Sequence, residues 1–131
     1  MLKIQMNEAK YTDKLIDLNY LKQLSFNDTA FEHAIIRQFI LQVPEELELL
    51  KEAIHKKNLR TIKSIAHSLK SSIAYLGLTD RLYTSLDRIE VEAASNTINP
   101  HFNEDFEQVE KVCRQAVQEA IQFLNVSVNL S

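Results

Sequence analysis

Glycine, proline and cysteine are all scarce in this chain. Its 131 residues include one glycine, two prolines, one cysteine and no tryptophan. Tight hairpin turns and phosphate-binding loops depend on glycine, so this scarcity excludes a glycine-rich nucleotide site and argues for helices joined by short connections. The lone Cys113 has no partner for an internal disulfide, which favours a reducing, cytoplasmic setting.

A strong net charge and long apolar runs are also lacking. The formal net charge of −3 leaves no basic footprint for nucleic acid. No window approaches the roughly 18 consecutive apolar residues of a membrane span, and the N-terminus lacks the layout of a secretory signal. We therefore expect no nucleic-acid partner and no membrane insertion. Hydrophobic residues make up 45% and charged residues 25%, which fits a single globular domain over residues 1–131.

Apolar residues recur at three- and four-residue spacings along most of the chain, the pattern of amphipathic helices. The pattern predicts one short helix or two small helical pieces from about Thr12 to Ser25, and long helices over about 29–56, 59–76, 80–94 and 102–125. The predicted fold is all-α, an antiparallel up-down-up-down four-helix bundle with an additional short N-terminal helix. Outside this pattern we expect a loose arm over residues 1–11 and a frayed tail over 126–131.

Polar residues, a glycine and a proline mark the expected ends and bends of these helices. Candidate caps at the helix starts are Asn27-Asp28-Thr29, Asn58, and either Thr79 or Asp80. Gly77 is placed to end the helix over 59–76. Pro44 lies inside the helix over 29–56 and predicts a bend or a brief break there, because proline removes a helical hydrogen bond.

One histidine lies on the polar side of the helix over 59–76. The apolar stripe of this helix consists of Ile62, Ile65, Ala66, Leu69, Ile73 and Leu76. His67 falls about 140° around the helix axis from Ile62. Its neighbours within one turn are Lys63, Ser64, Lys70, Ser71 and Ala74. The sequence therefore predicts an imidazole that stands in solvent among small side chains and two cations.

An exposed neutral imidazole can act as a nucleophile through the lone pair of one ring nitrogen. A phosphoryl group placed on His67 would carry about two negative charges. Lys70 is within reach of those oxygens, and Lys63 adds positive potential. Ser71 and Ala74 leave room for a partner to approach the ring. On the residues alone, an exposed histidine with no role remains an equal alternative.

Other candidate sites have simpler structural explanations. The sequence holds no Cys-x-x-Cys, no His-Glu-x-x-His and no two Glu-x-x-His motifs as in di-iron bundles. We interpret the acidic run of Glu45, Glu46 and Glu48 as a solvated face and Cys113 as a small buried apolar residue. The remaining histidines, expected at the surface without a metal, are His33, His55 and His101.

Around His67 the sequence resembles the histidine-containing phosphotransfer (Hpt) domains of multistep phosphorelays. The family pattern is Ala-His-x-Leu-Lys-Gly-Ser followed by Leu-Gly. This chain reads Ala66-His67-Ser68-Leu69-Lys70-Ser71-Ser72 and then Leu76-Gly77. Similarity to the family's flanking helices extends it over residues 17–124. One departure is Ser71, which adds a side chain where the family has glycine.

The resemblance implies that His67 accepts a phosphoryl group from an aspartyl phosphate on a receiver domain and passes it to another receiver. It implies that Lys70 neutralises the phosphoryl oxygens. The receiver is expected to supply Mg²⁺, so the chain has no cofactor of its own and is a monomeric phosphoryl carrier rather than an enzyme.

The predicted docking surface combines the rim around His67 with apolar residues of the helix over 29–56 that lie off its core stripe. Its members are Lys63, Ser64, Ala74, Ile36 and Ile40. Two other functions remain open. One is an interaction domain whose His67 is never phosphorylated, and the other is the phosphoacceptor domain of a chemotaxis-type histidine kinase.

Overall fold

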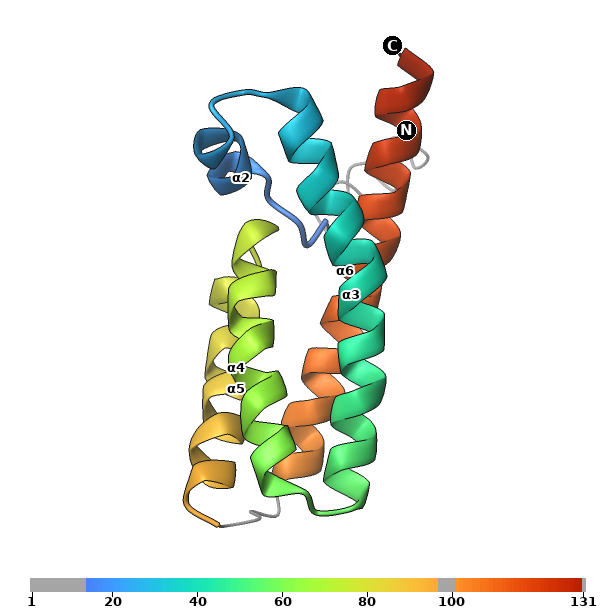
Figure 1. The fold of residues 1–131 in the computed structure, drawn as a ribbon. Coiled ribbons are helices and arrows are strands. Elements are labelled where there is room, and N and C mark those ends of the chain that lie inside the picture. Colours follow the sequence, from blue (N-terminus) through green and yellow to red (C-terminus); the bar gives the residue numbers. More distant parts are fainter. Residues whose placement is uncertain (1–13, 97–100, 131) are drawn as a thin grey trace, which may run out of the picture.

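A computed structural model describes residues 14–96 and 101–130 of the chain. These residues form helices and no strand: α2 (Asn19–Leu24), α3 (Thr29–His55), α4 (Leu59–Tyr75), α5 (Thr79–Ala94) and α6 (Phe102–Leu130). Figure 1 shows α3, α4, α5 and α6 side by side, with α2 across one end of the bundle. The predicted all-α bundle with a short extra helix is therefore confirmed, whereas the expected arm over 1–11 lies outside the described residues.

The four long helices pack in a ring. α4 packs on α3 and on α5, and α6 closes the ring against the same two helices. The buried residues of α4 recur along one stripe, at Ile62, Ala66, Leu69 and Ile73, as predicted. Each large apolar side chain removed from water contributes roughly 2 kcal/mol. Burial of this stripe fixes the rotation of α4 and turns its opposite face toward solvent.

The caps of α3 and α4 are as predicted. The Asp28 carboxylate accepts from the backbone N–H of Phe31 at 3.2 Å, and the Asn58 side chain accepts from that of Thr61 at 3.2 Å. The predicted cap of α5 is wrong, because Leu78 precedes this helix without a side-chain cap.

The end of α4 explains the missing cap of α5. Gly77, at φ 73°, and Leu78 close α4 with paired hydrogen bonds to the carbonyls of Ala74 and Ile73. Leu78 is fully buried in this motif, so α5 starts at the very next residue.

One predicted irregularity, the brief break at Pro44, is absent, whereas the alternative prediction of a bend there stays a prediction. α3 continues through Pro44 as one helix of 27 residues, without the predicted break. The proline ring costs one backbone hydrogen bond, and packing of the helix on both sides of it offsets that loss. α6 continues past Val126 to Leu130, and the expected fraying of residues 126–131 stays a prediction. No glycine or proline interrupts residues 102–130.

Within the predicted N-terminal segment only α2 is helical among the described residues, because residues 14–18 form an irregular strap across the end of the bundle. The Glu119 carboxylate of α6 accepts from the backbone N–H groups of Leu15 at 2.9 Å and Ile16 at 3.1 Å. The N–H of Asp17 donates to the carbonyl of Leu76 at 2.9 Å. These donors are therefore not used in helical hydrogen bonds.

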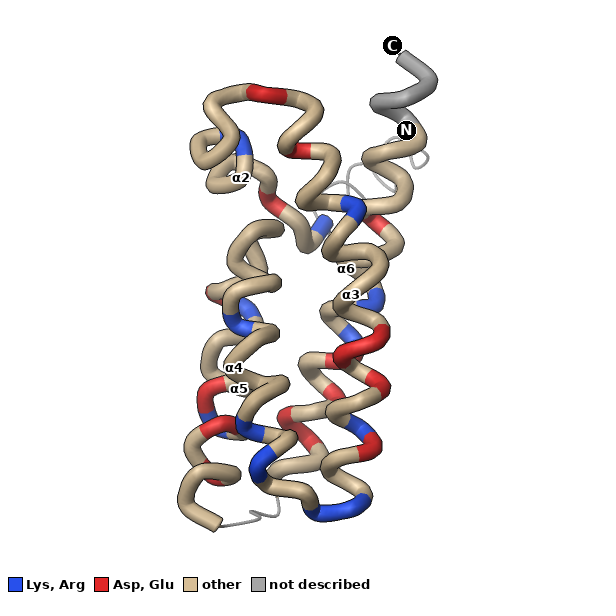
Figure 2. Tube along the Cα trace, in the orientation of Figure 1, with Lys and Arg blue, Asp and Glu red and all other residues tan. Residues whose placement is uncertain are grey.

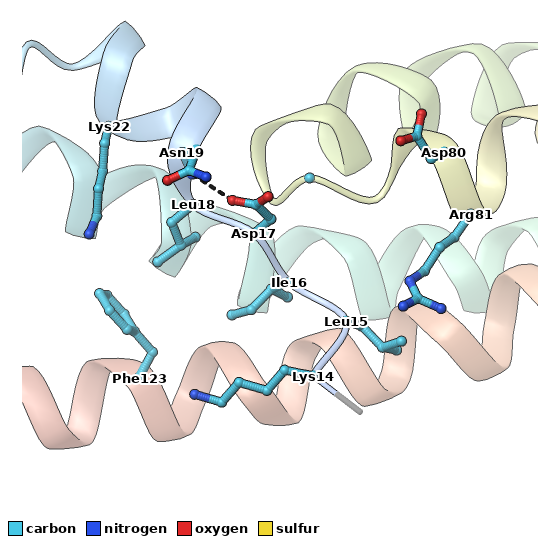
Figure 3. A pocket seen from close by; sticks show the side chains of 11 residues that line it. Lys14, Leu15, Ile16, Asp17, Leu18, Asn19, Lys22, Asp80, Arg81 and Phe123 are labelled. Carbon is cyan, nitrogen blue, oxygen red and sulfur yellow. Dashed lines mark hydrogen bonds between the residues drawn. The ribbon is translucent and has the colours of Figure 1, made fainter. Parts of the chain in front are cut away.

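The strap passes so close to Gly77 that a Cβ there would lie 2.6 Å from the carbonyl oxygen of Asp17. The single glycine of the chain therefore serves both as a helix stop and as a crossing point. A pocket of about 740 Å³ lies beside the strap. Figure 3 shows Ile16, Leu18 and Phe123 turned toward the same space.

The bundle interior contains one thiol and an unexpected carboxyl group. Cys113 is fully buried, and burial raises the pKa of its thiol to about 12, which agrees with its predicted structural role. Glu46 was predicted on a solvated face, but it is only 8% exposed and lies beside Ser68 of α4. Its Oε1 is buried without a hydrogen-bond partner among the described residues. Burial raises the pKa of Glu46 above its ordinary value of 4.5, although a hydrogen bond with Ser68 acts in the opposite direction.

We expect Glu46→Gln to stabilise the protein at neutral pH. A carboxyl group whose pKa is raised by folding adds stability below pH 4.5 and loses it as the pH rises through the folded value. The glutamine should therefore raise the free energy of unfolding by about 1 kcal/mol at pH 7, with a smaller difference in acid. Urea unfolding at both pH values measures this, with the exposed Glu107→Gln as control. Equal stability of Glu46→Gln and the native chain at neutral pH contradicts the prediction.

Candidate functional site around His67

His67 lies on the solvent face of α4, and its side chain is 74% exposed. The residues predicted around it lie on the same face. Lys63, Ser64 and Ser71 are exposed, and Ala74 is half-buried. The exposure expected from the apolar stripe is thus confirmed, and the small side chains leave the outer edge of the ring accessible.

Glu90 of α5 completes the site and was not predicted. Its Oε2 lies 3.1 Å from Nδ1 of His67, although the two residues are 23 positions apart. Only 17% of the Glu90 side chain is exposed. A hydrogen bond from Lys70 is the largest effect that lowers the pKa of Glu90, and one from His67 adds to it, while burial opposes both.

This hydrogen bond distinguishes the two nitrogens of the His67 ring. An ionised carboxylate can only accept, so Nδ1 must carry the proton that it donates to Glu90. In the neutral ring the lone pair then lies on Nε2, at the exposed edge of the imidazole. The arrangement presents one defined nucleophilic nitrogen to an approaching partner.

Lys70 is held against α5 by three groups. Its Nζ lies 2.7 Å from Oδ1 of Asp87 and 2.8 Å from Oε1 of Glu90, and 4.8 Å from the centre of the Tyr83 ring. Partial burial opposes the charge of Lys70, but the hydrogen bonds to Asp87 and Glu90 outweigh it and raise its pKa to about 12. Lys70 is therefore a permanent cation beside His67, joined to it through the Glu90 carboxylate.

The acidic half of this site depends on how α4 and α5 pack. Asp87 and Glu90 flank the buried Ile89, so a helical pattern places both beside the core stripe of α5. Two acids three positions apart on a predicted helix are common and point to no particular neighbour. Their pairing with Lys70 depends on how far α4 and α5 are shifted along each other. The spacing of apolar residues in the sequence does not determine that shift.

One predicted docking residue is in the core. Ile36 is fully buried, so its placement off the core stripe of α3 is wrong. The stripe runs through Ile36, Phe39 and Val43, and exposed Ala34 lies outside it. Ile40 is partly buried against the core, and its docking role stays a prediction. Mixed apolar residues between positions 31 and 41 left the rotation of this helix ambiguous in the sequence.

Charges are distributed unevenly over the bundle. Figure 2 shows the lower half of α4 and the turn between α3 and α4 as a largely basic region, with many acidic residues along α3 and α6. Lys63 belongs to this basic part of α4, one turn before His67. Lys63 therefore adds positive charge on the α4 side of His67, whereas Asp87 and Glu90 of α5 place negative charge on its other side.

Two kinds of feature are absent from residues 14–96 and 101–130. No three His, Cys, Asp or Glu side chains there gather in a group that could hold a metal ion. In the same ranges, no helix combines the length and apolar character needed to cross a membrane.

Comparison with known proteins defines the class to which this fold and site belong. The Hpt domain family matches residues 34–123, well over half of the chain, and includes α4 with His67 and α5 with Glu90. The chain belongs to the Hpt domain family.

Among curated proteins, it is similar to the phosphorelay intermediate protein YPD1 of Candida albicans, with 33% identity over 64 residues. That match covers 49% of this chain and 34% of the Candida protein, so it spans about a third of the relative's length. No solved structure matches the chain significantly.

We predict that Glu90→Ala allows the neutral His67 ring to adopt both tautomers. Without the carboxylate, Nδ1 has no acceptor, and the proton distributes between both ring nitrogens. Nitrogen NMR of the labelled imidazole in mildly alkaline solution should show mainly Nδ1–H in the native protein and a mixture in the variant. The matched control is Glu92→Ala, on the same helix. Identical ring spectra for native protein and Glu90→Ala would show that Glu90 does not fix the tautomer.

Proposed function

We propose that this protein is a phosphorelay intermediate, which takes a phosphoryl group from a receiver-domain aspartate onto His67 and passes it to another receiver. The observation that carries the proposal is the exposed Nε2 of His67, made the nucleophilic nitrogen by the bond between Nδ1 and Glu90. Membership of the Hpt family and similarity to a phosphorelay intermediate support it.

In the proposed step, the lone pair of Nε2 attacks the phosphorus of an aspartyl phosphate. A nitrogen–phosphorus bond forms, the bond from phosphorus to the aspartyl oxygen breaks, and the aspartate leaves as a carboxylate. The His67 ring gains positive character, which the adjacent Glu90 carboxylate stabilises. Reversal of the same step on a second receiver returns the free imidazole.

The charges at the site indicate which groups of the transfer reaction come from this chain and which come from the receiver. Lys70 is held beside His67 by two carboxylates, and its ammonium neutralises the phosphoryl oxygens after it exchanges one of these partners for them. We propose that the receiver brings Mg²⁺ and the remaining stabilisation of the transition state, so that this chain acts as carrier rather than as complete enzyme. The exposed Ser71, one turn beyond His67, gives the partner a hydroxyl group to accommodate at the closest approach.

The direct test is transfer from a phosphorylated receiver of the source organism. The native protein should acquire acid-labile phosphate, and His67→Gln should acquire none, because the amide lacks the nucleophilic lone pair. His55→Gln, which removes an exposed histidine of α3, should behave like the native chain. Label on His67→Gln, or a native chain that no receiver labels, would refute the proposal; the second result would favour an unphosphorylated interaction domain or a kinase-bound phosphoacceptor.

An aromatic pair extends the accessible surface beyond Ser71. Tyr75 of α4 lies two turns after His67, and its ring centre is 6.5 Å from that of Tyr20 on α2. Tyr20 is 50% exposed, and Leu24 on the same helix is 42% exposed. We propose that this apolar surface, in place of the buried Ile36, contributes to receiver docking.

Tyr20→Asp should therefore weaken receiver binding by about tenfold while leaving the fold intact. Its charge would stand in an apolar contact, but its position outside the bundle core spares the helices. Titration calorimetry measures the affinity, and circular dichroism checks the fold. Leu41→Asp, at a 76% exposed apolar position of α3, is the control. If both substitutions reduce affinity equally, the docking surface is placed wrongly.

A further inference from the structure

In this structure the Lys70 ammonium is already paired with two carboxylates before any phosphoryl group arrives. Its ammonium contacts Asp87 and Glu90 at 2.7 and 2.8 Å, and it lies 4.8 Å from the centre of the Tyr83 ring. The Lys70 side chain is only 18% exposed. A lysine in this position can reach phosphoryl oxygens on His67 only by giving up a carboxylate.

The two carboxylates differ in how much each would lose. Glu90 is 17% exposed and uses its other oxygen for Nδ1 of His67. Breaking its bond to Lys70 would leave a nearly buried charge with His67 as its one remaining ionic partner among the described residues. Asp87 is 43% exposed, and water can replace the ammonium at its carboxylate. Asp87 is therefore the partner that Lys70 leaves more easily.

The phosphoryl group is the stronger competitor. It carries between one and two negative charges and three acceptor oxygens, against a single charge on a solvated carboxylate. We infer that Asp87 is a positioning residue that competes with the phosphoryl group for Lys70 and releases Lys70 when His67 is phosphorylated. The exchange involves hydrogen bonds only, because the covalent change is confined to Nε2 of His67.

This role has a consequence for the direction of transfer. Asp87 stabilises the unphosphorylated carrier by its ion pair with Lys70. In the phosphorylated carrier this ion pair is lost, and the Asp87 carboxylate repels the nearby phosphoryl group. It therefore shifts the phosphoryl group from the carrier toward the receiver. This inference rests on the proposed function, but the rearrangement of Lys70 can be observed without a receiver.

The receiver-free test loads His67 with phosphoramidate, a small phosphoryl donor that needs no docking. Carbon NMR of the Asp87 carboxyl group should show a shift on loading in the native protein and none in Lys70→Met. Lys70→Gln serves as a second variant if the methionine disturbs the fold. An Asp87 signal that loading leaves unmoved in the native protein overturns the inference, whatever the receivers do.

The second test measures the partition of phosphate between carrier and receiver at equilibrium. Asp87→Asn should shift it about threefold toward the carrier, the effect of removing one partly exposed competing charge. Asp87→Glu should restore the native partition. Asp80→Asn, which removes an exposed acid from the first turn of α5, should leave it unchanged.

The decisive comparison repeats Asp87→Asn in the Lys70→Met background. If Asp87 acts through Lys70, its effect on the partition disappears there. A shift that persists without Lys70, or no shift in either background, refutes the inference while leaving receiver transfer to His67 intact. If phosphoramidate loads His67 but no receiver exchanges phosphate with it, the proposed function fails and the NMR experiment still decides the role of Asp87.

Discussion

The burial of one apolar stripe of α4 is the constraint on which the rest of this structure depends. Leu69 and Ile73 have no exposed surface, so α4 cannot rotate without moving large apolar side chains into water. The same rotation points His67 outward and turns Lys70 toward α5. Hydrophobic packing, with no chemistry of its own, thus fixes the direction in which a reactive nitrogen faces.

In the packed bundle, the Glu90 carboxylate holds the two reactive side chains, His67 and Lys70, in place. One oxygen contacts His67 and the other contacts Lys70, so nucleophile and cation share an anchor that is mostly withdrawn from solvent. On the far side of α5, Arg88 makes a two-pronged ion pair with the nearly buried Asp105 of α6 at 2.8 and 2.9 Å. α5 is therefore held from both sides, which limits the freedom of the acids that face α4.

The sequence predicted the parts of the molecule that depend on local pattern. The period of Ile62, Ala66 and Leu69 was sufficient to place His67 in solvent, and Asp28 and Asn58 cap their helices by contacts three residues away. Features that depend on two helices at once were missed. Glu90 is 23 residues from its histidine, and Glu46 faces inward only because α3 rotates to bury Ile36. Periodicity gives the faces of each helix, whereas register and rotation between helices come from packing in three dimensions.

The burial of Cys113 has a consequence for the kind of signal that this domain can carry. The thiolate is the form of cysteine that oxidants attack, and a fully buried thiol with a pKa of about 12 supplies almost none of it. Cys113 therefore does not react with peroxide or exchange with disulfides while the bundle stays folded. In the proposed relay, Cys113 would therefore give oxidants no means of altering phosphoryl transfer through His67.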